Sequence, residues 1–492
     1  MLIVIFFVST LFILRAFFTI RKNKKIIATD KAYIENYYKN HSWSDLPKVV
    51  VQIPLYNEPL VIRRTIDAVA ALEYPHDRLE IQLLDDSTDD TSSIITEHLQ
   101  RFKNSDIAIQ HIRRGNKNGF KSGALDEGLK YTDAEYIAIF DADFIPPKDF
   151  LLNTVPHFFN HPQLAFIQTR WDYLNTFSSF FTKIQAASMF KADIFRLRNL
   201  GKFSTFRGSG GVWRKQAIVS SGGWYTQSLC EDSNLSMRAY YNNWQSKYLF
   251  NVCCLCELPE NIKAYKNQRI RWSQGGMQNA IQMLAMGKSK ALWEQTSFKL
   301  KLTQIKDFFV QSNSLLCFLC LLVLPSLVLL VFKTPYKDFF IQTMQNIIIL
   351  LSFINIIAVY MYQSLFVGWK KAFLFTPLFF ISQLMPLANY SFGIIKAILG
   401  VSSEFKRTPK SGGDLLRHPS LFIENQKEKI GYWGIVLSEL TASSIFGYFA
   451  VKISDYSNVV AIPFFFFSLC FAVPCFLSIR EAFNLMSLSS NR

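Results

Sequence analysis

The sequence predicts an α/β domain built on a Rossmann-like parallel sheet, followed by an α-helical membrane domain. Half of the 492 residues are hydrophobic, too many for an ordinary soluble enzyme, yet 18% are charged, too many for a pure membrane bundle. The apolar residues concentrate in 2–20, 307–398 and 431–480, whereas 45–300 has a mixed composition. Within that mixed region, short β-branched runs alternate with helical periodicity, which is typical of a parallel sheet covered by helices.

The chain opens with an apolar segment, MLIVIFFVSTLFILRAFF. No basic region precedes it, no small-residue cleavage site ends it, and a group of cations at 21–25 follows it. Because Lys and Arg accumulate on the cytosolic side of membranes, we expect residues 1–22 to form a retained transmembrane helix whose carboxyl end faces the cytosol.

Strand and helix signals alternate in the region 45–273, which we expect to be a cytosolic domain. In such sheets, ligands bind beyond the carboxyl ends of the strands. Two of the predicted strands end in aspartates, Asp85-Asp86 and Asp141-Ala142-Asp143, so we expect the site there. The predicted strands are 49–53, 80–84, 107–112 and 136–140, and the predicted helices are about 60–72, 90–103 and 121–130.

Several function classes lose support from composition and motifs. No G-x-G-x-x-G follows an early strand and no P-loop occurs, which argues against dinucleotide binding and ATP hydrolysis. The net charge is +16, but much of it flanks apolar spans as on cytosolic loops, so we expect no nucleic-acid partner. Among the eight cysteines, 253, 254 and 256 cluster with Cys230 but lack the spacing of a zinc site, and we interpret them as unpaired thiols.

The region after residue 273 predicts the membrane domain. Residues 274–306 mix Met, Leu and Phe with Lys at helical spacing, which indicates amphipathic interfacial helices. Basic residues place the loop 399–430 and Lys370-Lys371 in the cytosol, so 373–398 cannot cross once between them. We expect 373–398 to be re-entrant or interfacial, with about four crossings in 307–482; the alternative is six crossings in all, with the basic loop outside. The apolar stretches are 307–332, 345–367, 373–398, 431–453 and 458–480.

The aspartates at the strand ends suit a metal and a diphosphate. Asp141 and Asp143 have D-x-D spacing, and carboxylate oxygens are preferred ligands of Mg²⁺ or Mn²⁺, with substrate phosphates completing the shell. Alone, such pairs are also common in solvated loops, and Asp85-Asp86 could cap a turn or helix. Lys121 could reach a phosphate, or it could start a helix in solvent.

Residues further along the chain suit sugar transfer. Asp232 could take the proton from an attacking hydroxyl, while the leaving diphosphate needs charge stabilisation. Trp272 offers an indole face for a sugar ring, and Gln268 and Arg271 could donate hydrogen bonds to the diphosphate. Taken separately, Glu231-Asp232 could be a surface pair and Trp272 an interfacial anchor.

Short motifs follow one another along the chain: VQIPLYNE, LLDDSTDDT, NGFKSGAL, FDADF, QTRW, GVWRK, GGW, CED, ELP, QRIRW and, in the basic loop, FKRTPK. In this order they resemble the cellulose synthase-like branch of the family 2 glycosyltransferases, strongly over about 45–280. Within that branch they are similar to plant mannan, glucomannan and xyloglucan-backbone synthases and their bacterial homologues.

The resemblance implies a GT-A fold, a nucleotide-sugar donor, Mg²⁺ or Mn²⁺, and inversion at the anomeric carbon. It implies that Asp143, with Asp141, holds the metal. It also implies that 405–410 is a cytosolic gating segment over the donor. The residues that it assigns to the nucleotide-sugar are Asn57, Glu58, Asp85, Asp86, Lys121, Asp141, Gln268 and Arg271.

For the transfer itself, the resemblance implies that Asp232 is the catalytic base and that Trp272 and Glu231 bind the acceptor. The Q-x-x-R-W motif at 268–272 usually accompanies processive synthesis.

Three stretches depart from the family pattern. Cys230 replaces the threonine of T-E-D, 186–206 lacks an H-F-x-x-E-Q type pattern, and 208–211 reads GSGG where relatives often have N-G-T-A-G. These departures leave the donor open between UDP-glucose and GDP-mannose.

We therefore predict an inverting membrane hexosyltransferase that extends a β-linked polysaccharide processively, with translocation. The alternative is transfer of one sugar to a membrane lipid, as in ceramide glucosyltransferase-like or polyprenyl-phosphate sugar transferases. A transporter is disfavoured because the C-terminal spans hold few charges, among them Lys396 and Glu439, and an inactive scaffold because every expected carboxylate is present. Abundant Lys, Asn, Ile and Phe suggest a bacterium and its inner membrane; in a eukaryote we expect the Golgi membrane.

Overall fold

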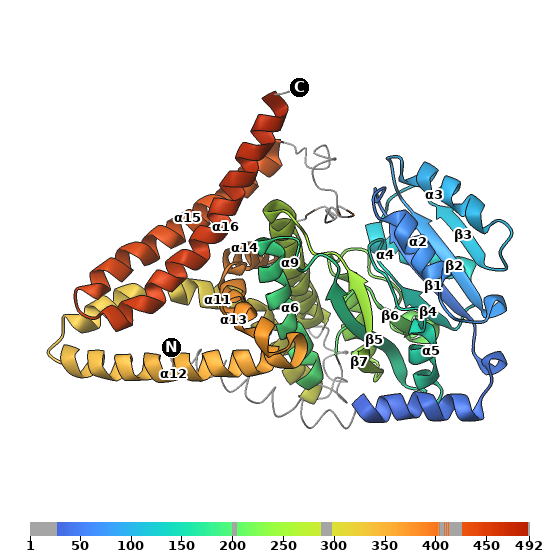
Figure 1. Ribbon diagram of the computed structural model, residues 1–492, viewed down its shortest axis with the longest axis horizontal. Coiled ribbons are helices and arrows are strands. Elements are labelled where there is room, and N and C mark those ends of the chain that lie inside the picture. Colours follow the sequence, from blue (N-terminus) through green and yellow to red (C-terminus); the bar gives the residue numbers. More distant parts are fainter. Residues whose placement is uncertain are drawn as a thin grey trace.

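The computed structural model describes most of the chain, and its two parts are visible in Figure 1: a sheet flanked by helices, and a group of long helices. The N-terminal helix expected at 1–22 lies outside the described residues, as do 287–297 and most of the basic loop 399–430. The described residues are 27–198, 204–286, 298–401, 403, 408, 410, 412 and 426–490.

A seven-stranded sheet forms the centre of the first part, in the order β3-β2-β1-β4-β6-β5-β7. Neighbouring strands are parallel except at β6, which runs antiparallel to both β4 and β5. The predicted α/β fold is therefore confirmed, with one reversed strand that the sequence pattern did not predict. The strands are β1 (Val49–Leu55), β2 (Leu79–Asp85), β3 (Ala108–Arg113), β4 (Tyr136–Ile139), β5 (Leu164–Tyr173), β6 (Gly211–Arg214) and β7 (Gln245–Cys256).

The two faces of the sheet carry separate apolar cores because side chains alternate along each strand. In β1, Val49 and Val51 pack in a cluster with α2 (Ile62–Ala70), whereas Val50 belongs to a cluster that includes residues of α4 (Phe120–Gly128). Both β1 and β2 are buried along almost their whole length, as expected for parallel strands covered on both faces. This burial fixes the carboxyl end of β1 between those of β2 and β4.

Two helices connect the sheet to the second part (Figure 1): α6 (Phe180–Arg198) packs against α13 (Trp369–Leu384), and α9 (Ile262–Met286) packs against α14 (Leu387–Ile398). Helix α9 continues without a break past residue 273, where we expected the cytosolic domain to end. The other helices of the first part are α3 (Thr91–Leu99), α5 (Phe150–Thr154), α7 (Lys215–Ser220) and α8 (Glu231–Tyr241).

Long apolar helices make up the second part. Besides α13 and α14, they are α11 (Phe298–Phe332), α12 (Lys337–Val367), α15 (Gln426–Ser454) and α16 (Asn458–Ser490). Helices α15 and α16 lie side by side. Within the described residues, the segments long and apolar enough to cross a membrane are Gln304–Phe332, Lys337–Met361, Trp369–Ile398, Tyr432–Ser454 and Asn458–Ala482.

The candidate span Trp369–Ile398 differs from the others in two ways. A turn at Met385 and Pro386 divides it into α13 and α14. The protein buries 61% of its apolar window, against 22, 17, 33 and 44% for the other four. Protein rather than lipid therefore surrounds most of this segment, and its re-entrant or interfacial path remains a prediction from the charge distribution.

Candidate active site

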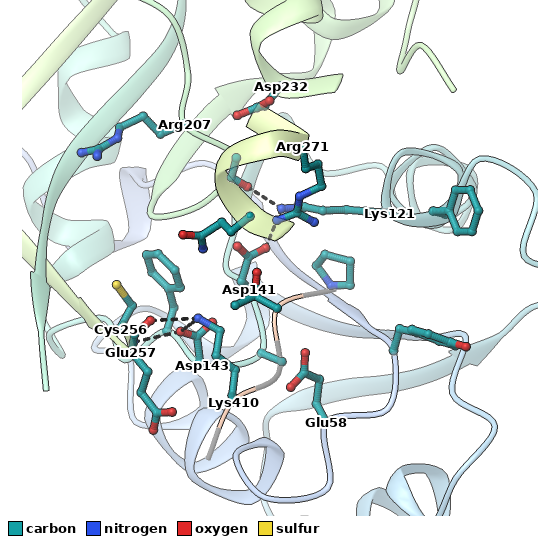
Figure 2. A pocket seen from close by; sticks show the side chains of 18 of the residues that line it. Glu58, Lys121, Asp141, Asp143, Arg207, Asp232, Cys256, Glu257, Arg271 and Lys410 are labelled. Atoms are coloured by element: carbon teal, nitrogen blue, oxygen red, sulfur yellow. Dashed lines mark hydrogen bonds and ion pairs between the residues drawn. The ribbon is translucent and has the colours of Figure 1, made fainter. Parts of the chain in front are cut away.

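A cavity of about 320 Å³ lies beyond the carboxyl ends of β1 and β4, where α9 forms one wall (Figure 2). The residues that line it come from segments spread between residues 54 and 410. The sequence-predicted residues among them are Glu58, Asp86, Lys121, Asp141, Asp143, Glu231, Asp232, Gln268, Arg271 and Trp272.

Asp141 and Asp143 follow β4, and each faces a lysine ammonium (Figure 2). The Lys121 Nζ lies 2.5 Å from an Asp141 carboxylate oxygen. Asp143, only 3% exposed, accepts hydrogen bonds from the Lys410 Nζ at 2.7 Å and from the Glu257 backbone N–H at 2.9 Å. Burial lowers the pKa of both lysines, but the neighbouring carboxylates outweigh it and raise each pKa above the ordinary lysine value. Both cations therefore stay charged.

The donor set fits a divalent metal that shares its shell with a substrate. The contact between Lys410 and Asp143 shows that this carboxylate accommodates a positive charge at close range. Within the described residues, no three His, Cys, Asp or Glu side chains converge as a metal site. A metal at Asp141 and Asp143 would therefore need further oxygens from phosphates and water, which is the usual arrangement for Mg²⁺.

Glu231 and Asp232 lie at the start of α8, with Glu231 buried at 7% exposure. A helix N-terminus favours negative charge, but burial acts against it. Burial and the charge of Asp232 raise the pKa of Glu231 to about 7. Burial also raises the pKa of Asp232, although the Ser233 backbone and Lys121 oppose it. A carboxylate with a raised pKa is a stronger proton acceptor near neutral pH.

Gly208 allows the Lys121 ammonium and the Asp232 carboxylate to approach each other. Its φ is +86°, and its carbonyl accepts a hydrogen bond from Lys121 at 2.9 Å. A Cβ added there would lie 3.2 Å from Asp232 Oδ2 and 3.5 Å from Lys121 Nζ. The GSGG stretch that departs from the family pattern thus begins with a glycine that Asp232 and Lys121 both approach.

One face of α9 supplies Gln268, Arg271 and Trp272 to the cavity, because positions i, i+3 and i+4 share a helix face. Arg269 supports this face from the side. Its guanidinium lies 4.6 Å from the Trp272 ring centre and 4.7 Å from the Tyr265 ring centre. The indole is thus held by a buried cation.

Asp85 and Asn57, both predicted to bind the nucleotide, do not line the cavity. The Asp85 side chain is fully buried and accepts hydrogen bonds from His111, Ser92 and the Ser87 backbone. Burial raises its pKa, but these hydrogen bonds outweigh burial and lower the pKa well below the usual range. Asn57 has a φ of 57° and accepts the Thr88 N–H at 2.8 Å. Both residues shape the loops around Asp86.

Other cavity residues escaped the sequence prediction. Lys117 lies over the Tyr56 ring at 4.5 Å, and Arg207 lies over the Trp171 ring at 4.2 Å. Trp171 and Glu257 stood in quoted motifs without an assigned role, whereas Arg207 carried no sequence signal. Outside the lining, Arg114 holds Asp86 through two of its nitrogens, Nε at 2.9 Å and Nη2.

Two family models match this chain. A family model described as glycosyl transferase family 2 matches residues 50–220, and one described as glycosyl transferase family group 2 matches residues 136–401.

Curated plant proteins are similar over about half of the chain. A probable glucomannan 4-beta-mannosyltransferase 6 from Oryza sativa subsp. japonica is 37% identical over 279 residues, which cover 54% of this chain and 47% of that protein. A probable glucomannan 4-beta-mannosyltransferase 11 from the same plant is 41% identical over 236 residues, covering 46% and 41%. The chain spans about half the length of the curated relatives that it matches.

Among solved structures, a mannosyltransferase from Pyrobaculum calidifontis in complex with GDP-Man and Mn²⁺ is similar with a TM-score of 0.47 and 17% identity. That similarity covers 80% of this chain and 100% of that one.

Proposed function

Since this chain belongs to glycosyl transferase family group 2, we propose that it transfers mannose from GDP-mannose to a growing β-linked glycan. Within family 2, it belongs to the cellulose synthase-like glycosyltransferases. The observation that carries the proposal is the single cavity in which Asp143, Asp232 and Trp272 meet. Similarity to glucomannan 4-beta-mannosyltransferases favours mannose over glucose, which leaves UDP-glucose as the second donor to test.

Asp232 acts as the general base in the proposed reaction. An acceptor hydroxyl oxygen attacks the anomeric carbon, its proton passes to the Asp232 carboxylate, and the bond between that carbon and the phosphate oxygen breaks. Attack from the side opposite the leaving group inverts the configuration. The raised pKa of Asp232 supports this role, because a base is most effective when its pKa approaches the working pH.

The leaving nucleoside diphosphate needs positive charge, and the cavity supplies it. Lys121 and Arg271 line the same cavity as Asp141 and Asp232, and each can donate hydrogen bonds to phosphate oxygens there. We assign Glu58 and Asp86 to the nucleotide side, and Glu231 and Trp272 to the acceptor.

A Mg²⁺ or Mn²⁺ ion held by Asp143 and Asp141 would supply further charge stabilisation to the diphosphate when bound. The contact between Lys410 and Asp143 supports this assignment, because it places a cation against the same carboxylate. Lys410 also ends the segment 405–410, most of which lies outside the described residues, and the gating role of that segment stays a prediction.

The proposed acceptor site lies next to the membrane. Helix α9 forms a wall of the cavity and packs against α14 and α11 on its other side. This arrangement supports polymer synthesis with translocation, and it also suits a lipid acceptor, which stays the second candidate. We place the sheet domain in the cytosol, at a bacterial inner membrane or, in a eukaryote, at the Golgi membrane.

The test is product formation by the purified full chain in detergent. Radiolabelled GDP-mannose and UDP-glucose are supplied in parallel with Mg²⁺ or Mn²⁺, and Asp232→Asn is the matched control. We expect label from GDP-mannose in an ethanol-insoluble, mannanase-sensitive product that the variant does not make. Label confined to the organic phase contradicts the polymer and supports the lipid acceptor, while label from UDP-glucose alone contradicts the donor.

A further inference from the structure

The helix that carries Gln268, Arg271 and Trp272 is held on another side by a buried ion pair. The Lys266 Nζ lies 2.5 Å from a Glu439 carboxylate oxygen, and neither side chain is exposed. The pair joins α9 to α15 across 173 positions of sequence. The proposed transfer reaction does not use either group.

Both charges have additional polar partners. The second carboxylate oxygen of Glu439 accepts a hydrogen bond from the Asn389 side chain of α14 at 3.3 Å. The Lys266 Nζ lies 5.4 Å from the ring centre of Tyr432 on α15. Burying charge is costly unless the charges are paired and hydrogen-bonded, so the three helices α9, α14 and α15 are restricted to arrangements that keep this contact.

The position of Lys266 on α9 lets the ion pair control the direction of the cavity residues. At 3.6 residues per turn, Lys266 lies roughly 120–160° around the helix axis from Gln268, Arg271 and Trp272. A contact fixed on one side of a helix sets its rotation about the axis, and that rotation aims the side chains on the other side.

Other contacts hold α9 as well. Arg269 donates to the Tyr390 hydroxyl of α14 at 3.4 Å, and Gln274 donates to the Val401 carbonyl at 2.8 Å. Helix α14 also approaches α9 closely at Gly393, where an added Cβ would lie 2.6 Å from the Ile270 carbonyl oxygen. The contact between Lys266 and Glu439 differs from these because it is a fully buried ion pair and joins α9 to α15.

We propose that Lys266 and Glu439 are positioning residues, which aim Gln268, Arg271 and Trp272 into the cavity by fixing the rotation of α9. The inference rests on the proposed function of that cavity. Neither residue touches donor or acceptor, so its effect passes through α9. The nucleotide side of the donor is assigned to Glu58 and Asp86, which lie outside α9, whereas Arg271 is assigned to the leaving diphosphate. We therefore expect the loss to fall on kcat more than on the donor KM.

The experiment replaces the pair by neutral side chains of similar size, Lys266→Met with Glu439→Gln, so that no unpaired charge is left buried. We expect kcat to fall at least tenfold while the donor KM changes less than threefold. The matched control is Gln363→Leu with Thr376→Val, which removes buried hydrogen bonds between α12 and α13, from the Thr376 hydroxyl to Gln363 at 3.2 Å and from the Gln363 amide to the Phe375 carbonyl at 3.1 Å. The control should keep kcat within twofold of the unchanged chain. Both are assayed per folded molecule, measured by thermal unfolding.

A neutral-pair variant with kcat within twofold of the unchanged chain would overturn the proposal, as would an equal loss in the control. A second readout does not depend on transfer: the alkylation rate of a thiol introduced by Gln268→Cys, followed by peptide mass spectrometry. We expect the neutral pair to change this rate at least threefold, and an unchanged rate overturns the positioning role. No transfer by the unchanged chain would instead contradict the proposed function, and the alkylation rate would still decide the role of the pair.

Discussion

At the scale of single residues, Glu231 and Asp232 are adjacent acidic groups with little access to water. Two neighbouring carboxylates in a buried position resist carrying two negative charges at once. Lys121 offsets part of this repulsion for both groups. The site therefore holds a proton at pH values where exposed carboxyl groups have lost theirs.

The pH dependence of transfer should report this proton. Because Asp232 must be ionised to accept the hydroxyl proton, and because burial raises its pKa above the ordinary value, we expect the acid limb of kcat to lie at a higher pH than for an ordinary carboxyl group. An ordinary carboxyl group would place that limb near pH ~4. The measurement is kcat at saturating donor between pH 5 and 8.5. In Glu231→Gln the limb should move to lower pH, and a flat profile down to pH 5 would contradict the assignment.

Lys410 and a metal should compete for Asp143. The Lys410 ammonium donates to one Asp143 carboxylate oxygen at 2.7 Å, so a divalent ion that binds without donor must approach a carboxylate that is already paired. We expect Lys410→Met to bind Mn²⁺ severalfold more tightly in the absence of donor, measured by electron paramagnetic resonance titration of the full chain.

The matched control for this titration is Lys130→Met, which removes an exposed lysine far from the cavity that pairs with Glu127. Mn²⁺ affinity should be unchanged in the control. Weaker or equal Mn²⁺ binding by Lys410→Met would show that the lysine does not compete for the carboxylate.

Sequence reasoning could place several single residues at the cavity, although their roles stay predictions. Asp86, Asp141, Asp143 and Asp232 all line the cavity as expected. Asp85 does not line the cavity. Its carboxylate points into the protein, where it accepts hydrogen bonds from Ser87, Ser92 and His111. Whether Asp85 or Asp86 points into the protein depends on the pleat of β2, which the sequence alone does not specify.

At the scale of elements, the sequence predicted β1, β2, β3 and β4, whereas it did not predict β5, β6 or β7. β1, β2 and β4 are buried almost throughout and read as apolar runs. β6 has only four residues, too few to show a period.

The cysteines 253, 254 and 256 belong to β7, where Cys254 and Cys256 are buried in the sheet core. Their clustering therefore reflects a strand.

The contact between α14 and α9 gives a prediction at this scale. A Cβ at Gly393 would lie 2.1 Å from Ser273 Oγ and 2.6 Å from the Ile270 carbonyl oxygen. Gly393→Ala should therefore separate the helices, lower the unfolding free energy by about 1–3 kcal/mol and reduce kcat.

The control for Gly393→Ala is Gly434→Ala in α15, where nothing lies within 4 Å of the added Cβ. This change should be neutral or stabilise by about 0.5–1 kcal/mol, because alanine favours a helix over glycine. The comparison uses thermal unfolding and kcat of both variants. Equal behaviour of the two would mean that the close approach at Gly393 is not required.

At the scale of the whole molecule, contacts between distant segments decide how the site is assembled. Arg114 meets Asp86 across 28 positions, and Lys266 meets Glu439 across 173. The sequence next to these residues does not indicate their partners. Nothing near Glu439, for example, points to a partner in α9. The sequence therefore predicted the class of fold and ten of the residues that line the cavity, but not the contacts that hold these residues in place.

A fragment that ends where the composition changes should not retain the site. Cutting at residue 273 would remove Gly275, which packs against Cys230, and Asn279, whose side chain donates to the Cys230 carbonyl at 3.0 Å. Both contacts hold the start of α8, where Asp232 lies. We expect fragment 27–273 to bind GDP at least tenfold more weakly than the full chain, by isothermal titration calorimetry. Equal affinity would show that the two parts are independent.

Helix α9 also links the transfer reaction to the thickness of the bilayer. A membrane helix whose apolar length differs from the thickness of the lipid tilts or shifts to compensate. Since α15 is tied to α9 through Glu439 and Lys266, a change in its tilt acts on the same helix that presents Arg271 and Trp272. The turnover rate should therefore depend on the acyl-chain length of the surrounding lipid. A detergent that is chosen for solubility alone changes this rate as well.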